Sequence, residues 1–77
     1  MTELFGSESC PYTSELREDL RWRGVEFEEY DVNIDPSALR RLLELREGDR
    51  TIPVLVNDGT VTQVGVGGRG CYAHAPG

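Results

Sequence analysis

Lysine is absent from this sequence, and the eight basic residues, all arginine, are outnumbered by fourteen acidic ones. The resulting net charge of -6 leaves few cations to form a cluster. Because proteins bind nucleic acids and anionic membrane surfaces through clustered cations, neither is expected as a partner. Apolar runs are also short, and none approaches the roughly 20 residues that a membrane-spanning helix needs. The composition therefore argues against a nucleic-acid-binding or membrane protein.

Cysteine and histidine are scarce. Two Cys and one His fall short of the four ligands of a structural zinc site, so no metal is expected. The acidic segment Met1-Thr2-Glu3 leads directly into an apolar pair, so no signal peptide is expected either. Two cysteines without an export signal fit a reducing cytosol, where disulfides tend to be transient and catalytic. We therefore expect a cytoplasmic protein, with an exported one as the alternative.

The order of apolar and polar residues predicts a single domain over residues 1–77, which is small for a domain that folds on its own core. Strands are predicted at Leu4-Phe5, 25–32, 51–56 and 60–64, with helices over 11–23 and from Pro36 until Gly48. The acidic residues within 25–32 are typical of an edge strand. Asn57-Asp58-Gly59 is a hairpin turn signal, so the last two strands are antiparallel. The predicted fold is an α/β domain of order β-α-β-α-β-β with a four-stranded mixed sheet, followed by a short irregular tail at 71–77.

Cys10 follows the first predicted strand and directly precedes Pro11. Proline suits the first position of a helix, where its missing N–H costs no hydrogen bond, so the Cys10 sulfur is predicted at a helix N-terminus. The free N–H groups and the positive end of the helix dipole favour a thiolate there. Thr13, one turn later, can offer its hydroxyl to the same sulfur. A redox site is the leading interpretation, and a free cysteine that begins a helix by chance is the alternative.

Cys71 follows the glycine-rich run at 65–70, which comes after the last predicted strand. Because that strand is antiparallel to its neighbour, the run can return toward the Cys10 helix. Three outcomes stay open for the two cysteines: a disulfide that cycles, a structural staple, and no bond at all. The glycine run matches no dinucleotide-binding fingerprint, since no helix follows it. It indicates close backbone approach near Cys10, or simple flexibility.

Pro53 lies inside the predicted strand at 51–56, although proline cannot donate to a strand ladder. One explanation is a cis Ile52–Pro53 bond that turns the Ile52 backbone outward as a dock for a peptide-like substrate. Few X–Pro bonds in folded proteins are cis. The residues alone therefore favour the other explanation, a proline at the first residue of a strand.

Taken together, these segments resemble a glutaredoxin. Cys10-Pro11-Tyr12-Thr13 is similar to the C-P-Y-C or C-P-Y-S active site of that family, and Thr51-Ile52-Pro53 to its T-V-P motif, in which the proline is cis. Gln63-Val64-Gly65 stands where the family has its glycine pair, so the resemblance runs from residue 2 to about residue 71. It implies a thioredoxin-like fold, Cys10 as the nucleophile and the Ile52 backbone as the dock for glutathione. The substrate-binding residues that it implies are Tyr12, Arg50, Thr51, Ile52, Pro53 and Gly65.

The sequence also departs from the family pattern. Thr13 replaces the second cysteine of C-x-x-C, so that disulfide is impossible, and Ser7 stands where the family usually has a lysine. The acidic residues that hold glutathione after the glycine pair are absent, so glutathione should bind more weakly, by up to about tenfold. Cys71 lies close to the resolving cysteine of several monothiol members. The pattern, with G-R-G-C near its end, is most similar to a small bacterial group in which some members carry selenocysteine at the position of Cys10.

The resemblance therefore implies thiol–disulfide exchange. Cys10 attacks an oxidised sulfur and Cys71 resolves the mixed disulfide, while Thr13 steadies the thiolate. No bound cofactor is expected; glutathione is a possible co-substrate, and a protein disulfide is a possible substrate. Two alternatives stay open. One is a carrier in which paired subunits hold an iron–sulfur cluster with Cys10 and glutathione, and the other is a non-catalytic relative whose cysteines only staple the tail.

The last helix of the family is missing, which leaves one face of the predicted sheet with only the helix at 11–23. We expect the segment 65–72 to pack across this face with Tyr72 as its plug, which favours a monomer over a pair of subunits. Pro76 and Gly77 argue against a helix in the tail. A Cys10–Cys71 bond would hold the segment in place, so reduction should loosen residues 66–77 and leave the sheet intact.

Overall fold

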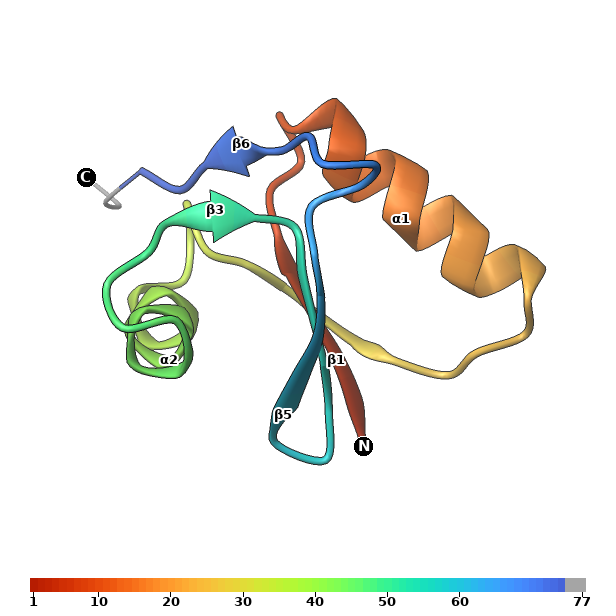
Figure 1. The fold of residues 1–77 in the computed structure, drawn as a ribbon, viewed down its shortest axis with the longest axis horizontal. Helices are drawn as coiled ribbons and strands as arrows, with labels where there is room; N and C mark the ends of the chain where they lie inside the picture. The colour runs from red at the N-terminus through yellow and green to blue at the C-terminus, as the bar shows by residue number, and fades with distance from the viewer. Residues whose placement is uncertain (75–77) are drawn as a thin grey trace.

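The computed structural model describes residues 1–74, which form two helices and six strands. In chain order these are β1 Thr2–Gly6, α1 Pro11–Trp22, β2 Glu28–Asp31, α2 Pro36–Leu45, β3 Thr51–Ile52, β4 Val54–Asn57, β5 Thr60–Val64 and β6 Cys71–Tyr72. Figure 1 shows the main strands crossing the middle of the molecule, with α1 and α2 on opposite sides. Each face of the sheet is therefore covered by one helix.

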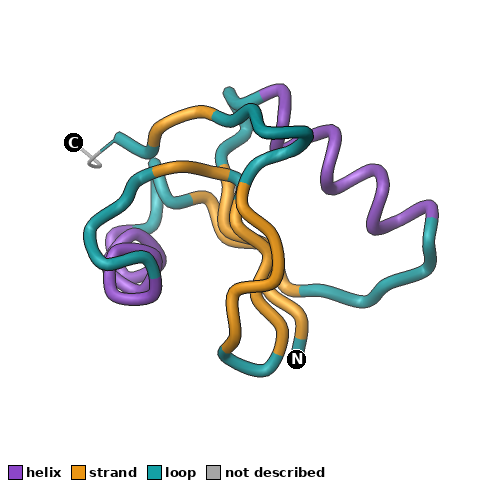
Figure 2. Tube along the Cα trace, viewed as in Figure 1, coloured by secondary structure: helices purple, strands orange, loops and turns teal. Residues whose placement is uncertain are grey.

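The main sheet has the strand order β2-β1-β4-β5. β1 is parallel to β2 and antiparallel to β4, which forms a hairpin with β5. The turn residues Asp58 and Gly59 have φ of 50° and 81°, and this positive φ at both positions is typical of a two-residue hairpin. Figure 2 shows these strands side by side between the helices. The predicted element order and four-stranded mixed sheet are confirmed, and the acidic strand β2 lies at an edge.

Each helix begins where the sequence provides a start signal. Pro11 is the first residue of α1 and Pro36 that of α2. The Asp35 carboxylate caps α2 by accepting two N–H groups of its first turn at 3.0 and 3.3 Å. α1 ends just before Gly24, whose φ of 71° suits glycine. Within residues 1–74, no helix is long and apolar enough to cross a membrane.

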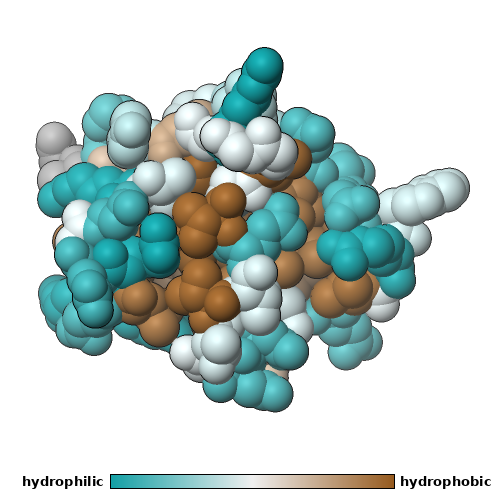
Figure 3. All heavy atoms as spheres, in the orientation of Figure 1, coloured by the Kyte–Doolittle hydropathy of each residue, from teal (hydrophilic) through white to brown (hydrophobic). Residues whose placement is uncertain are grey.

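Two apolar layers, one on each face of the sheet, hold the helices. Neighbouring strand residues point to opposite faces, so Leu4 packs toward α1 and Phe5 toward α2. The layer on the α2 side also contains Cys10, Ile52 and Ala73. On the face seen in Figure 3, hydrophobic side chains gather near the centre and hydrophilic ones surround them. The segment around Cys10 is therefore anchored in the core.

The second strand is shorter than predicted. Only Glu28–Asp31 pairs with β1, and residues 25–27 lie outside the ladder. Val25 and Phe27 pack against the layer on the α1 side, whereas Tyr30 packs against the layer on the α2 side. The broken alternation in the sequence therefore marks the change from loop to strand.

The apolar run at 51–56 does not form one strand. It divides at Pro53 into β4, which lies inside the main sheet, and β3, which leaves that sheet to pair with β6. The Ile52–Pro53 bond is cis, as the resemblance implies. The explanation favoured by the residues alone, a proline that merely opens a strand, is therefore incomplete.

The prediction of an irregular tail is wrong for its first residues, because Cys71 and Tyr72 form β6 on the edge of β3. The Cys71 side chain points inward, where it is bonded to Cys10. Because side chains alternate along a strand, the next side chain, that of Tyr72, points outward. Tyr72 is accordingly 72% exposed and does not plug the α1 side of the sheet. Val66 packs there in its place. The expectation for residues 76–77 lies outside the described part of the chain.

Candidate active site

Cys10 occupies the N-cap position of α1. Its carbonyl accepts the N–H groups of Thr13 and Ser14 at 3.1 and 3.3 Å, and its own N–H donates to the Ser7 carbonyl at 3.1 Å. The residue is only 2% exposed. The sulfur therefore lies at the positive end of the helix dipole, a position that stabilises a thiolate.

A disulfide joins Cys10 to Cys71, with the two Cα atoms 6.1 Å apart. Of the three outcomes left open by the sequence, the absence of a bond is excluded for this form of the protein. Cys71 lies on β6 and is only partly buried, so one sulfur belongs to the core and the other lies nearer to solvent. Figure 1 shows the segment that carries β6 close to the start of α1, the two places that the disulfide joins.

Thr13 is fully buried and lies against Gly6 at the end of β1. A Cβ at position 6 would overlap the Thr13 side chain, so glycine lets the helix approach the strand. Thr13 Oγ1 accepts the N–H of Ser7 at 3.2 Å and makes no hydrogen bond to Cys10 Sγ in this disulfide form. Thr13 thus holds the loop that carries Cys10, and its contact with a free thiolate stays a prediction.

A chain of hydrogen bonds runs from this loop to the C-terminal segment. Ser7 Oγ lies 2.9 Å from Ser9 Oγ and accepts the side-chain amide N–H of Asn33 at 2.9 Å. Asn33 Oδ1 in turn accepts the backbone N–H of His74 at 2.7 Å. Three separate parts of the chain therefore meet around Asn33: the Cys10 loop, the turn after β2 and the residues after β6.

Two cavities flank the disulfide. The larger has a volume of about 490 Å³, and its lining includes Tyr12, Thr51, Gly65 and Cys71. The smaller has a volume of about 280 Å³, and its lining includes Cys10, Ile52, Cys71, Ser7, Asn33 and His74. Most of the residues predicted from the sequence thus surround the two sulfurs. Pro53 is buried and lines neither cavity, and its carbonyl accepts the Gly65 N–H at 2.7 Å.

Thr51 and Arg50, two of the predicted binding residues, make contacts that the sequence did not predict. The Thr51 hydroxyl and N–H both donate to the Asp49 carboxylate, at 2.7 and 2.8 Å, and these bonds lower the pKa of Asp49. The side chain of Arg50 is exposed and lines neither cavity. The Arg50 carbonyl, however, accepts the Ala73 N–H at 2.8 Å. Arg50 therefore contacts the C-terminal segment through its backbone.

The segment around β6 lies closely against β3, with Cys71 opposite Ile52. A Cβ at Gly70 would lie 2.5 Å from the Ile52 carbonyl oxygen, so this approach requires glycine. Ala73, just beyond β6, is 3% exposed and packs in the layer on the α2 side. The chain's own C-terminal segment therefore occupies the backbone edge that the resemblance assigns to a substrate.

Asn33 and Gly70 are not among the residues predicted from the sequence. Asn33 follows β2 as Ser7 follows β1, and the ends of two neighbouring parallel strands lie at the same edge of a sheet. That placement is a signal from which Asn33 could have been found. No such signal exists for Gly70, because its role depends on a carbonyl group far away in the sequence.

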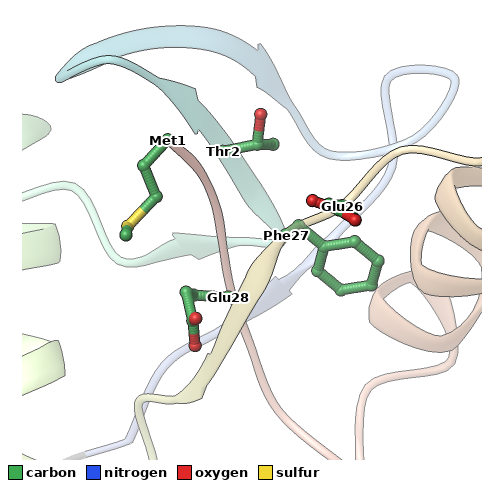
Figure 4. A pocket seen from close by; sticks show the side chains of 5 residues that line it. All are labelled: Met1, Thr2, Glu26, Phe27 and Glu28. Carbon is green, nitrogen blue, oxygen red and sulfur yellow. The ribbon is translucent and has the colours of Figure 1, made fainter.

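A further cleft, of about 460 Å³, lies at the other end of β1 and is lined by Met1, Thr2, Glu26, Phe27 and Glu28. Figure 4 shows the Phe27 ring and the Glu28 carboxylate pointing in different directions from the same stretch of chain. No thiol lines this cleft. Among residues 1–74, no group of three or more His, Cys, Asp or Glu side chains is placed to hold a metal ion.

A disulfide at a helix N-terminus beside a central mixed sheet defines a thioredoxin-like protein, and solved structures agree with this class. The chain is similar to the thioredoxin-like protein BC3987 and to a mutant of that protein, each with 32% sequence identity and a TM-score of 0.73. Both matches cover 80% of this chain, and they cover 84% and 82% of the respective structures. The predicted thioredoxin-like fold is confirmed.

The glutaredoxin family model matches residues 2–62. A protein of Synechocystis sp. (strain ATCC 27184 / PCC 6803 / Kazusa), named as a probable glutaredoxin, is 35% identical over 57 residues, which is 73% of this chain. The chain spans about half of that relative, 52% of its length. This chain belongs to the glutaredoxin family.

Proposed function

We propose that this protein carries out thiol–disulfide exchange, with Cys10 as the nucleophile and Cys71 as the resolving cysteine. The observation that carries the proposal is the disulfide between Cys10, at the N-cap of α1, and Cys71, on a separate strand. A sulfur at a helix N-terminus is stabilised as a thiolate, which makes it both an available nucleophile and a good leaving group. A disulfide with a purely structural role does not require one of its sulfurs to lie at a helix N-terminus.

The reaction consists of two exchange steps. The Cys10 thiolate attacks one sulfur of a substrate disulfide, and the other substrate sulfur leaves as a thiolate that takes a proton from water. Cys71 then releases its proton to water and attacks Cys10 Sγ, which displaces the second substrate sulfur. Two electrons thus pass from the protein dithiol to the substrate, and the Cys10–Cys71 disulfide forms. A small dithiol, or two molecules of a monothiol such as glutathione, returns the protein to its reduced form.

The proposed substrates are protein disulfides, with glutathione as a co-substrate. Tyr12, Thr51 and Gly65 surround the larger cavity beside Cys71 and offer a ring face and backbone groups to a peptide-like chain. Once β6 leaves β3, the Ile52 backbone can pair with an extended peptide. We place this chemistry in a reducing compartment such as the cytoplasm and in a monomer without a bound cofactor.

The glutathione site has fewer charge contacts than the family pattern provides. Ser7 has no charge, and the Arg50 side chain lines neither cavity. Since an exposed ion pair contributes only about 0–1 kcal/mol, binding should be weaker by up to about tenfold and not abolished. A chemical-shift titration with glutathione measures this. Tight binding, or no binding at millimolar glutathione, would contradict the prediction.

The roles of the two cysteines are tested with Cys10→Ser and Cys71→Ser in a glutathione-coupled disulfide reduction assay. Cys10→Ser should abolish the reaction, because it removes the nucleophile. Cys71→Ser should accumulate a mixed disulfide on Cys10, visible by mass spectrometry, because the resolving thiol is gone. Alkylation of Cys10 in the Cys71→Ser variant at several pH values should show a thiolate near neutral pH. A folded protein whose disulfide resists millimolar dithiol would instead support a structural staple.

A further inference from the structure

Asn33 is the residue through which the Cys10 loop and the C-terminal segment are joined by side-chain hydrogen bonds. It lies in the turn after β2, where its own N–H donates to Asp31 Oδ1 at 2.9 Å. Its side chain uses both of its ends: Nδ2 donates to Ser7 Oγ and Oδ1 accepts the His74 N–H. The backbone N–H groups of Ile34 and Asp35 also close this turn by donating to the Asp31 carbonyl at 3.2 and 2.9 Å. The turn is therefore closed by bonds other than those of the Asn33 side chain, which instead joins two other segments of the chain.

The two partners of the Asn33 side chain belong to the two halves of the redox site. Ser7 is 3% exposed, and its carbonyl accepts the Cys10 N–H while its own N–H donates to Thr13. His74 lies three residues after Cys71, and both His74 and Asn33 line the smaller cavity with the two sulfurs. Asn33 thus ties the backbone that carries the resolving thiol to the loop that carries the nucleophile.

We propose that Asn33 is a positioning residue for the resolving step: it holds the residues after β6 near the Cys10 loop, so that Cys71 can attack the mixed disulfide. This inference rests on the proposed function. The other contacts of the segment, the β3–β6 pairing and the Ala73 N–H to the Arg50 carbonyl, use the edge of β3. A peptide substrate competes for that edge. The Asn33 contact lies on a different part of the chain and stays available while the substrate is bound.

The resolving step is an intramolecular displacement. The Cys71 thiolate forms a bond to Cys10 Sγ, the bond from Cys10 to the substrate sulfur breaks, and the substrate leaves as a thiolate that takes a proton from water. Its rate depends on how often Cys71 lies within reach of Cys10, that is, on the effective concentration of the thiol. Losing one hydrogen bond that restrains the segment should lower this rate by about three- to tenfold. Attack by Cys10 on a small disulfide, which does not need the β3 edge, should depend little on the segment.

In the experiment, an excess of reduced protein is mixed with a chromogenic aromatic disulfide, and the release of chromophore is followed over time. This separates the two steps. The first release of chromophore reports attack by Cys10, and its rate rises with protein concentration. The second release reports attack by Cys71, and its rate is independent of concentration. Asn33→Ala should slow the second phase about three- to tenfold and leave the first within about twofold. Asn57→Ala, which removes the same amide at the far end of β4, should change neither phase.

A second variant tests whether Asn33 acts through the C-terminal segment. His74→Pro removes the N–H that Asn33 Oδ1 accepts and leaves the Cys10 loop untouched. It should slow the second phase, and the double variant should be no slower than Asn33→Ala, because the contact that His74→Pro removes is already absent in Asn33→Ala. Additive losses, an equal slowing of both phases, or an unchanged second phase in Asn33→Ala would overturn the positioning role. A wild-type protein without any concentration-independent phase would overturn the proposed function itself.

Discussion

Alanine at Gly70 is the substitution that tests most directly whether the C-terminal segment must lie on β3 for the disulfide to form. A Cβ at this position would lie 2.5 Å from the Ile52 carbonyl oxygen and 3.2 Å from Thr51 Cγ2, whereas ordinary contact begins at 3.4 Å. Both neighbours belong to β3, and the nearer one is backbone that cannot rotate away. The segment must therefore move off the strand.

The cost follows from the contacts that such a movement breaks. Ala73 would leave the core, which costs about 0.8 kcal/mol for its methyl group, and its N–H would lose the Arg50 carbonyl, at about 0.5–1.5 kcal/mol. The disulfide holds the segment against β3, whereas the reduced segment is free to move away, so this cost falls mainly on the oxidised form. Together these two costs come to about 1.3–2.3 kcal/mol, so the disulfide equilibrium should shift toward the dithiol by about nine- to fiftyfold.

In the assay, the protein is equilibrated in glutathione redox buffers and its free thiols are trapped by alkylation. Mass spectrometry then quantifies the disulfide and dithiol forms. Gly67→Asn is the matched control in the same loop, because Gly67 has φ of 59°, which asparagine tolerates, and no atom within 4 Å of its Cβ position. The control should shift the equilibrium less than twofold. A Gly70→Ala protein with the wild-type equilibrium, or a control with an equal shift, would refute the reasoning.

Three further outcomes are expected. The Arg41 guanidinium, by its hydrogen bonds at 2.8 and 2.9 Å, lowers the pKa of the Glu3 carboxyl below its ordinary 4.5 despite burial. That contribution to stability is present above the ordinary pKa and is lost as the pH falls through the lower folded-state value. In urea unfolding, Glu3→Gln should therefore lose less stability than wild type as the pH is lowered from about 5. Thr13→Val keeps the shape of the side chain but leaves the buried Ser7 N–H without its acceptor, so unfolding of the oxidised protein should become easier by about 1–3 kcal/mol; an unchanged midpoint would contradict this. Reduction should speed amide exchange in residues 66–74 and leave the main sheet protected, and a segment that stays rigid without its disulfide would disprove the expected loosening.

Features that depend on neighbouring residues could be predicted from the sequence. Pro11 and the Asp35-Pro36 pair mark the helix starts because capping and proline geometry are local effects. The hairpin at 57–59 follows from the conformations open to asparagine, aspartate and glycine. These signals, with the alternation of apolar residues, suffice for the element order and the four-stranded sheet.

Features that depend on distant partners could not be predicted. β6 has only two residues, too few for any periodicity, and its position follows from the glycine at 70 and the edge left open by β3. The same pairing turns Tyr72 outward, so the prediction that it fills the α1 side of the sheet is wrong. The Cys10–Cys71 bond was one of three open outcomes, because the residues cannot show how far the glycine run returns. The strand order could have placed Asn33 at the same sheet edge as Ser7, but its contact with His74 depends on where β6 lies.

The division of the redox site along the chain has a consequence for how this chemistry can be altered. The strands of the main sheet and both helices, including the one that begins after Cys10, all end at or before Val64. The glutaredoxin match likewise lies within residues 2–62. Cys71, the proposed resolving thiol, lies on a separate segment that is held by one disulfide, a two-residue strand, the packing of Ala73 and a few hydrogen bonds. In the proposed mechanism, the second thiol would therefore act as a nucleophile tethered to the rest of the chain. Substitutions in its segment can convert a two-thiol protein into a one-thiol protein, or change how long a mixed disulfide persists, while the part that makes the first attack keeps its structure.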